Sequence, residues 1–330
     1  MAGEMTKADR LRAAIAGAEA DRPPIALWRH FPVDDQSPAT LAESALRFQR
    51  ELDLDLIKVT PASSYSVADW GVQDEWRGDA EGTRDYTVRV VTEPSDWRDL
   101  PSLPAGMGKL AEHLDCLRAV CREAGEDVPV VATVFSPLAQ AKHLAGEERL
   151  LDHLHRAPGD VEAGLETITQ RTIAFVEAAR ATGISGIFYA VQHATYIYFD
   201  EAGYSRFGEP YDRRILEAAG GLWLNLLHLH GEAVIFDLAS RLPVQVVNWH
   251  DRHTGPSLAD ARRRFKGALC GGLRRWETLV LGRPEDVVAE AQGAVRSVGG
   301  KGLILGAGCV VPVLAPRSNL EAARHTIDFA

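Results

Sequence analysis

The chain has 330 residues, and 36 Lys and Arg against 46 Asp and Glu give it a formal net charge of −10. Its 46% hydrophobic residues supply a large apolar core, which excludes a disordered chain. No apolar stretch approaches the roughly 20 residues of a membrane span, and the acidic balance argues against nucleic acid as a partner.

The chain opens with MAGEMTKADRLRAAIAG, which is charged and amphipathic and has no apolar signal core. We therefore expect a cytoplasmic protein. The four cysteines, at positions 116, 121, 270 and 309, are too few and too scattered for a disulfide scaffold. They are expected to be reduced thiols or metal ligands.

Short apolar runs of strand length alternate with longer amphipathic segments along the chain. The eight predicted strands are PIALWRH (24–30), LDLIKVT (54–60), VPVVATVF (128–135), SGIFYAV (185–191), LNLLHLH (224–230), VQVVNW (244–249), KGALCGG (266–272) and KGLILGA (301–307). The predicted helices between them include 39–52, 164–183, 231–242, 257–265 and 284–300. Several of these open on Ser or Pro and close on Gly, as capped helices do.

Eight strands, each followed by a helix-like segment, predict an α/β fold. The fold is a single (β/α)8 TIM barrel that spans residues 1–330 as one domain. A doubly wound open sheet is the alternative, but no G-x-G-x-x-G motif follows the first strand. Two insertions interrupt the alternation, at 61–105 after the second strand and at 192–212 after the fourth. Because both leave carboxyl ends of strands, where barrel enzymes build their active sites, we expect them to act as lids or substrate walls.

Reactive side chains gather at the same strand ends. Six of the eleven histidines lie at or just after a predicted strand end, namely His30, His193, His228, His230, His250 and His253. Scattered structural histidines would not collect in this way, so the pattern favours an active site at the carboxyl face of the barrel.

The sharpest group is His228-Leu229-His230 on the fifth strand together with Cys309 after the eighth. Alternate strand residues share a face, so both imidazoles can point into the barrel. Two histidines and a thiolate make a three-ligand zinc set with one position open, which is typical of catalytic zinc. Hydrogen-bonded barrel histidines and a small buried thiol are the structural alternative.

Two other segments suggest chemistry. Arg29-His30 ends the first strand and could bind a carboxylate, although an arginine there can equally serve a structural ion pair. In Asn248-Trp249-His250-Asp251, His250 could act as an acid or base oriented by the neighbouring carboxylate.

The order of these motifs resembles the superfamily of uroporphyrinogen decarboxylase and the zinc-dependent corrinoid methyltransferases, over nearly the whole chain. The similar segments are TKADRLRAAIAGAEADRPPIALWRHF, GGLRRWETLVLGRPEDVVAEAQGAV and LGAGCVVPVLAPRSNLEAARHTI. The resemblance implies an enzyme on a (β/α)8 barrel that acts on a thiol, a corrinoid or a tetrapyrrole.

Within the methyltransferase branch, the resemblance implies zinc ligands at an H-x-C on strand five and a cysteine in a P-G-C-x-x-P loop. His228 and Cys309 match the first and last ligand, and His230 falls on the middle cysteine, a replacement that zinc accepts. For the decarboxylase branch, Arg29 matches the first arginine of M-R-Q-x-x-R, while the family's strand-three tyrosine falls on His143. The late G-H-G histidine of that branch is Ala307 here.

The sequence therefore predicts a zinc-dependent methyltransferase that moves a methyl group between a corrinoid carrier and a thiol, with methylcorrinoid as co-substrate and a corrinoid protein as a candidate partner. Its alternative is decarboxylation of uroporphyrinogen or another tetrapyrrole, and a binding protein that has lost its chemistry is a third interpretation. Arg29, His143 and His250 are the candidate catalytic residues. The candidate substrate-binding residues are Arg29, His30, Tyr65, Tyr189, Gln192, His193 and Asn248.

Overall fold

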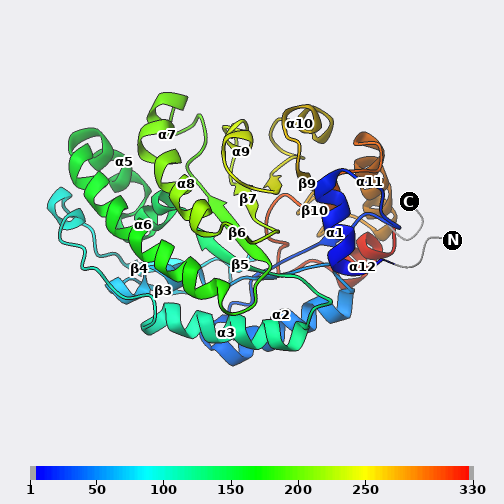
Figure 1. Ribbon diagram of the computed structural model, residues 1–330, viewed down its shortest axis with the longest axis horizontal. Coiled ribbons are helices and arrows are strands. Elements are labelled where there is room, and N and C mark those ends of the chain that lie inside the picture. The colour runs from blue at the N-terminus through cyan, green and yellow to red at the C-terminus, as the bar shows by residue number, and fades with distance from the viewer. Residues whose placement is uncertain (1–4, 327–330) are drawn as a thin grey trace.

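The computed structural model describes residues 5–326, and an eight-stranded parallel sheet forms its centre (Figure 1). The strand order is β1-β10-β9-β8-β7-β6-β5-β2. The strands are β1 (Ile25–Ala26), β2 (Ile57–Val59), β5 (Val130–Phe135), β6 (Gly186–Val191), β7 (Leu226–Leu229), β8 (Val246–Trp249), β9 (Ala268–Leu273) and β10 (Leu303–Ala307). Each overlaps one of the eight predicted runs, so the predicted (β/α)8 barrel is confirmed.

Helices surround this sheet, and in Figure 1 the neighbouring helices α2 and α3 run along its lower edge. The helices are α1 (Lys7–Ala16), α2 (Pro38–Leu52), α3 (Gly108–Ala124), α4 (Pro137–Ala145), α5 (Glu147–Arg156), α6 (Pro158–Arg180), α7 (Glu201–Phe207), α8 (Glu209–Ala218), α9 (Leu238–Arg241), α10 (Leu258–Arg264), α11 (Pro284–Ser297) and α12 (Arg317–Thr326). A separate antiparallel hairpin is formed by β3 (Gln73–Glu75) and β4 (Asp85–Val88).

A buried carboxylate joins the two strands at the ends of the sheet order, β1 and β2. The backbone N–H of Asp55 donates to Ile25 O at 2.9 Å, and the N–H of Ile25 donates to Asp55 Oδ2 at 2.8 Å. Arg22 and Arg10 pair with the same carboxylate, at 2.7 Å and 3.3 Å. The Asp55 side chain therefore forms ion pairs with two guanidinium groups while it connects the ends of the sheet.

The first strand is shorter than the predicted run 24–30. Beyond Ala26 the chain stays beside the loop that follows β10, where Val311 N donates to Trp28 O at 2.7 Å. This single hydrogen bond keeps the chain after β1 beside the chain after β10, but the two segments do not form a regular ladder of strand hydrogen bonds.

The helix predicted over 231–242 is correct only for its last turn, α9. Before it, Val234 forms an antiparallel bridge with Thr195 of the second insertion, and Ile235 N donates to Ala194 O at 2.8 Å. Pairing with the insertion satisfies backbone groups that a helix would have used internally, and this tertiary contact overrides the helix-like pattern.

The first insertion, 61–105, contacts loops that follow distant strands. Val313 N, after β10, donates to Ala80 O at 2.7 Å, and Trp276 Nε1, after β9, donates to Glu81 Oε1 at 2.9 Å. The insertion therefore reaches across the carboxyl ends of the barrel strands, which we call the barrel mouth.

Candidate metal centre at the barrel mouth

The structure brings His228, His230 and Cys309 together. His228 lies on β7, His230 follows two residues later, and Cys309 lies just after β10. His228 Nε2 is 3.4 Å from His230 Nδ1, and Cys309 Sγ is 3.6 Å from the first nitrogen and 3.8 Å from the second. The alternation of side chains along β7 thus places both imidazoles on the inner face, as the H-x-H spacing predicted.

These separations fit the edges of a zinc tetrahedron. Zn–N bonds of about 2.0 Å and Zn–S bonds of about 2.3 Å give edges of roughly 3.3 Å between two nitrogens and 3.6 Å between nitrogen and sulfur. His250, which follows β8, completes the group, because ligand atoms of all four residues lie within 4.8 Å of one another. Its Nε2 is buried and has no hydrogen-bond partner among the described residues. Three histidines and a cysteine form a donor set that suits zinc.

Asn248 fixes the orientation of the His228 ring. The Asn248 Nδ2 group donates to Cys270 O at 2.9 Å and to Ala307 O at 3.0 Å, so its Oδ1 must face His228. His228 Nδ1 therefore carries the proton that it donates to Oδ1 at 2.6 Å. The lone pair of Nε2 is left free and points at the other ligand atoms, the arrangement in which a hydrogen-bonded partner prepares a metal-binding imidazole.

The electrostatics of the group favour a thiolate at Cys309. Burial acts to raise the pKa of Cys309, but the attraction of His228 and hydrogen bonds from His228 and His230 outweigh it, so that the pKa lies well below its usual value. Burial lowers the pKa of His228. A deprotonated cysteine and neutral histidines are the forms that bind metal.

Lys58, which the sequence analysis did not single out, lies on β2 inside the barrel. Its Nζ stands 4.4 Å from the ring centroid of Phe188, and that ring stacks on His228 at 5.2 Å. Burial lowers the pKa of Lys58 to about 7, although the attraction of Cys309 opposes this change. His30, predicted to bind substrate, is half-buried near Cys309 and Lys58, and its desolvation lowers its pKa to about 4.

Two further candidate histidines lie around the mouth. His193 is buried, donates a hydrogen bond from Nε2 to Glu147 Oε1 at 3.0 Å, and has its pKa lowered by burial. His143, on α4, stacks on Tyr86 of the first insertion with ring centroids 5.0 Å apart. The insertion thus covers one of the candidate catalytic residues, in agreement with its expected position over the mouth.

Other predicted residues lie apart from the histidine and cysteine group. Tyr189 turns outward to α8, where its hydroxyl donates to Asp212 at 2.6 Å. Tyr65 donates to Thr133 O at 2.6 Å. Both side chains are buried among protein groups, so their geometry indicates packing.

Arg29 and Gln192 keep unused polar groups near the mouth. The Arg29 guanidinium is partly buried over Phe31 at 5.6 Å, and within residues 5–326 no carboxylate forms an ion pair with it. Gln192 Oε1 is buried and lacks a hydrogen-bond partner in the same part of the chain. His250 and Asp251 do not form the predicted pair. Asp251 Oδ1 instead accepts a hydrogen bond from the N–H of Gly272 at 3.2 Å.

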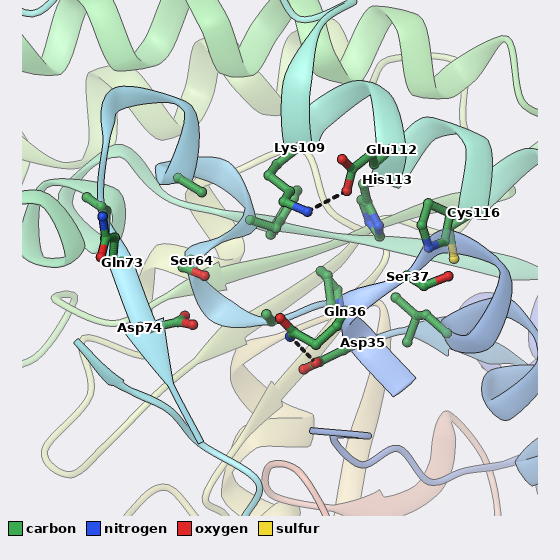
Figure 2. A pocket seen from close by; sticks show the side chains of 17 residues that line it. Asp35, Gln36, Ser37, Ser64, Gln73, Asp74, Lys109, Glu112, His113 and Cys116 are labelled. Atoms are coloured by element: carbon green, nitrogen blue, oxygen red, sulfur yellow. Dashed lines mark hydrogen bonds and ion pairs between the residues drawn. The ribbon is translucent and has the colours of Figure 1, made fainter. Parts of the chain in front are cut away.

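A cavity of about 340 Å³ lies between the N-terminal parts of α2 and α3 and the first insertion. Figure 2 shows Asp35, Asp74, Ser64, Lys109 and His113 around it. It contains none of the four residues His228, His230, His250 and Cys309, which we call the metal-type group. Its carboxylates are partly neutralised by Arg84, which pairs with Asp35 at 2.7 Å and with Asp74 at 3.4 Å.

The nearly closed parallel barrel with reactive groups at its carboxyl face defines an enzyme of the (β/α)8 class. The chain belongs to the uroporphyrinogen decarboxylase (URO-D) family, whose model matches residues 6–328. The predicted superfamily is thereby confirmed. No helix within residues 5–326 is long and apolar enough to cross a lipid bilayer.

Among curated proteins, the chain is similar to the methylcobamide:CoM methyltransferase MtbA of Methanosarcina mazei, with 22% identity over 247 residues, 74% of this chain and 71% of the relative. Among solved structures, a methyltransferase from Methanosarcina mazei superposes with a TM-score of 0.87 at 18% identity, covering 98% of this chain and 99% of that one. A B12-independent methionine synthase from Shewanella sp. W3-18-1 superposes with a TM-score of 0.58 at 12% identity, covering 92% of each chain. At these identities the structural likeness establishes the fold.

Proposed function

We propose that the protein is a zinc-dependent methyltransferase that moves a methyl group between a corrinoid carrier and a thiol. The observation that carries this proposal is the group of His228, His230 and Cys309, whose separations match the edges of a zinc tetrahedron, with His250 within 4.8 Å of them. The similarity to a methylcobamide:CoM methyltransferase supports the choice of reaction.

His228, His230 and Cys309 would hold the zinc, and His250 would occupy the fourth position until a thiol takes its place. Zinc bound there would lower the pKa of the thiol and keep its sulfur as a nucleophilic thiolate. Asn248 holds His228 in the tautomer that donates its Nε2 lone pair. Once displaced, His250 has a free ring nitrogen that can accept the proton of the incoming thiol.

The residues of the mouth would bind and enclose the two substrates. Arg29, which has no carboxylate partner in the described part of the chain, would bind an acidic group of the corrinoid. Gln192, His193 and His30 would contact substrate, and His143 beneath Tyr86 would help the first insertion to exclude water. The partners are then a small thiol and a corrinoid, free or carried by a corrinoid protein.

Metal content and methyl transfer test this proposal together. Gently isolated protein should contain about one zinc per chain and should methylate a thiol from methylcobalamin under anaerobic conditions. His230→Ala should lose most of both, whereas His253→Ala, outside the group, should keep both. Wild-type protein without stoichiometric zinc, or His230→Ala with normal zinc and turnover, contradicts the proposal.

Decarboxylation of uroporphyrinogen is the second candidate, and the family that the chain belongs to favours it. Arg29, His30 and His143 could order and protonate an acidic tetrapyrrole without a metal. Conversion of uroporphyrinogen, followed by chromatography of the products, distinguishes the two functions, because zinc removal should abolish only methyl transfer.

A further inference from the structure

The cavity beside α2 and α3 contains one more buried carboxylate than the cations around it balance. Asp35 and Asp74 both line this space of about 340 Å³ (Figure 2). Arg84 pairs with both, at 2.7 Å and 3.4 Å, and within residues 5–326 no other cation forms an ion pair with either. The Asp35 side chain is fully buried, and that of Asp74 is 9% exposed. One guanidinium therefore serves two buried carboxylates, which leaves a net negative charge.

Each of these carboxylates also has an oxygen without a hydrogen-bond partner. Asp35 Oδ2 and Asp74 Oδ2 are buried and accept no hydrogen bond in the described part of the chain. In Figure 2 the two side chains point toward each other from opposite sides of the cavity. Asp35 Oδ1 accepts a hydrogen bond from the Gln36 amide at 2.6 Å, but Gln36 is exposed and can turn away. Burial raises the pKa of Asp35 although Gln36 and Arg84 act in the opposite direction, so the charge of this carboxylate is incompletely stabilised.

His113 is a second, independent sign of a missing partner. It lies on α3, it is 4% exposed, and its buried Nε2 has no hydrogen-bond partner among residues 5–326. Figure 2 shows its ring directed from α3 into the cavity. Burial lowers the pKa of His113 to about 3, so the ring is neutral at pH 7 and one of its nitrogens can accept a hydrogen bond.

The rest of the lining is apolar or electrically balanced. Leu41, Val72 and Ala62 are buried residues of the cavity wall. Lys109 and Glu112, whose side chains are both about half exposed, pair with each other at 2.6 Å. This pair adds no net charge, so the uncompensated negative charge lies at the two aspartates. A small molecule with one positive charge and an apolar part matches such a lining.

We propose that this cavity is a binding site for a small organic ammonium compound. The ammonium group donates to the free oxygens of Asp35 and Asp74 and takes the place of the Gln36 amide, because a charged donor binds a carboxylate more strongly than a neutral one. His113 accepts a further hydrogen bond, and the organic part lies against the apolar wall. The site contains no residue of the metal-type group and is therefore independent of the proposed methyl transfer.

Calorimetric titration of the full-length protein with three probes of one shape, benzylamine, benzyl alcohol and benzoate, tests this assignment. Benzylamine should bind roughly tenfold to a hundredfold more tightly than benzyl alcohol, as expected for hydrogen bonds to charged groups, and benzoate should bind least. The affinity for benzylamine should be the same in zinc-loaded and zinc-free protein, because the amine does not bind at the metal-type group. Absent binding of benzylamine, equal affinities for the amine and the alcohol, or loss of amine binding with zinc overturns the inference and leaves the proposed function intact.

Substitutions locate the amine. Asp74→Asn removes one carboxylate charge and should abolish the preference for benzylamine over benzyl alcohol. The matched control is Asp85→Asn on the same hairpin, an exposed residue outside the cavity, which should retain the preference. Gln36→Ala removes the competing neutral donor and should bind benzylamine about threefold to tenfold more tightly than the wild type.

A preference for benzylamine that persists in folded Asp74→Asn overturns the inference, and so does weaker binding of benzylamine by Gln36→Ala. His113→Phe provides a further test if Asp74→Asn fails to fold, because it keeps an aromatic ring but removes the nitrogen acceptor. This variant should bind benzylamine more weakly and benzyl alcohol less strongly than the wild type, and unchanged affinities would contradict the assignment. The comparison of the three probes in the wild type needs no variant.

Discussion

The amide of Asn248 and the imidazole of His228 face each other on neighbouring strands, with Oδ1 2.6 Å from Nδ1. Because the same amide donates to the carbonyls of Cys270 and Ala307, its orientation is set by β9 and by the end of β10. A polar side chain of β8 thus determines the protonation of the ring on β7 that faces the metal-type group.

Asn248→Ala should weaken zinc binding by about tenfold to a hundredfold, because His228 loses the partner that fixes its tautomer and orientation. Competition with a fluorescent chelator measures this affinity. Cys121→Ala is the control, since this thiol lies on α3 and outside the group. Unchanged affinity in Asn248→Ala would show that the barrel alone orients His228.

In zinc-free protein, Cys309 should react with iodoacetamide at pH 6.5 nearly as fast as at pH 8.5, because its pKa lies well below the usual value. An ordinary thiol slows about fiftyfold over this interval. Burial raises the pKa of Cys116 to about 12 and that of Cys121 to about 11, so these thiols should stay unlabelled. Mass spectrometry of tryptic peptides identifies the labelled residue, and slow labelling of Cys309 at pH 6.5 contradicts the assignment.

Zinc should protect Cys309 from that reaction. Protein reloaded with one equivalent of zinc should lose most Cys309 labelling, and His230→Ala treated in the same way should remain reactive because it cannot retain the metal. Equal labelling with and without zinc in the wild type would mean that Cys309 is not a ligand.

The buried carboxyl of Asp212 should make stability depend on pH. Burial raises its pKa to about 7, even though hydrogen bonds from Tyr189 and Tyr204 act in the opposite direction. The native state then holds a proton that the unfolded chain releases above about pH 4, so this group favours folding at low pH and loses that contribution as pH rises toward 7. Asp212→Asn should reduce the fall in unfolding free energy by up to about 1.4 kcal/mol per pH unit. Urea titrations of both proteins between pH 4.5 and 7 provide the measurement, and parallel pH profiles would contradict it.

Asp55→Ala should lower the free energy of unfolding by about 3 to 5 kcal/mol, because Arg22 and Arg10 lose a buried counter-ion and Ile25 N–H loses its acceptor. The matched control is Asp115→Ala, which removes an exposed carboxylate paired with Arg118 and should cost at most about 1 kcal/mol. A similar urea midpoint for both variants would show that the contacts of Asp55 between β1 and β2 contribute no more to the free energy of unfolding than an exposed ion pair does.

Periodicity predicted all eight barrel strands, because each is a short apolar run between turn residues. It also predicted that His228 and His230 share the inner face, since that follows from alternation along one strand. The role of Asn248 depends on carbonyls from two other strands, and local sequence does not contain that information. Lys58 did carry a signal, a lysine at the centre of an apolar strand run, but its neighbours Phe188 and Cys309 lie far away along the chain.

His250 illustrates the same limit in a different way. Its neighbour Asp251 suggested a local pair, yet the carboxyl turns to the N–H of Gly272, while the imidazole joins the side chains of His228, His230 and Cys309. The helix expected at 231–242 was wrong for its first part because Val234 and Ile235 pair with the second insertion. In each case a contact between distant segments overrides a local preference.

His228 and Cys309 face each other although 81 positions separate them in the chain. An ion bound between them would act as a cross-link that closes this long segment, which includes β8, β9 and β10. Release of the ion and separation of these three strands would then be linked events, so that the half-life of the bound metal would report how often the strands separate.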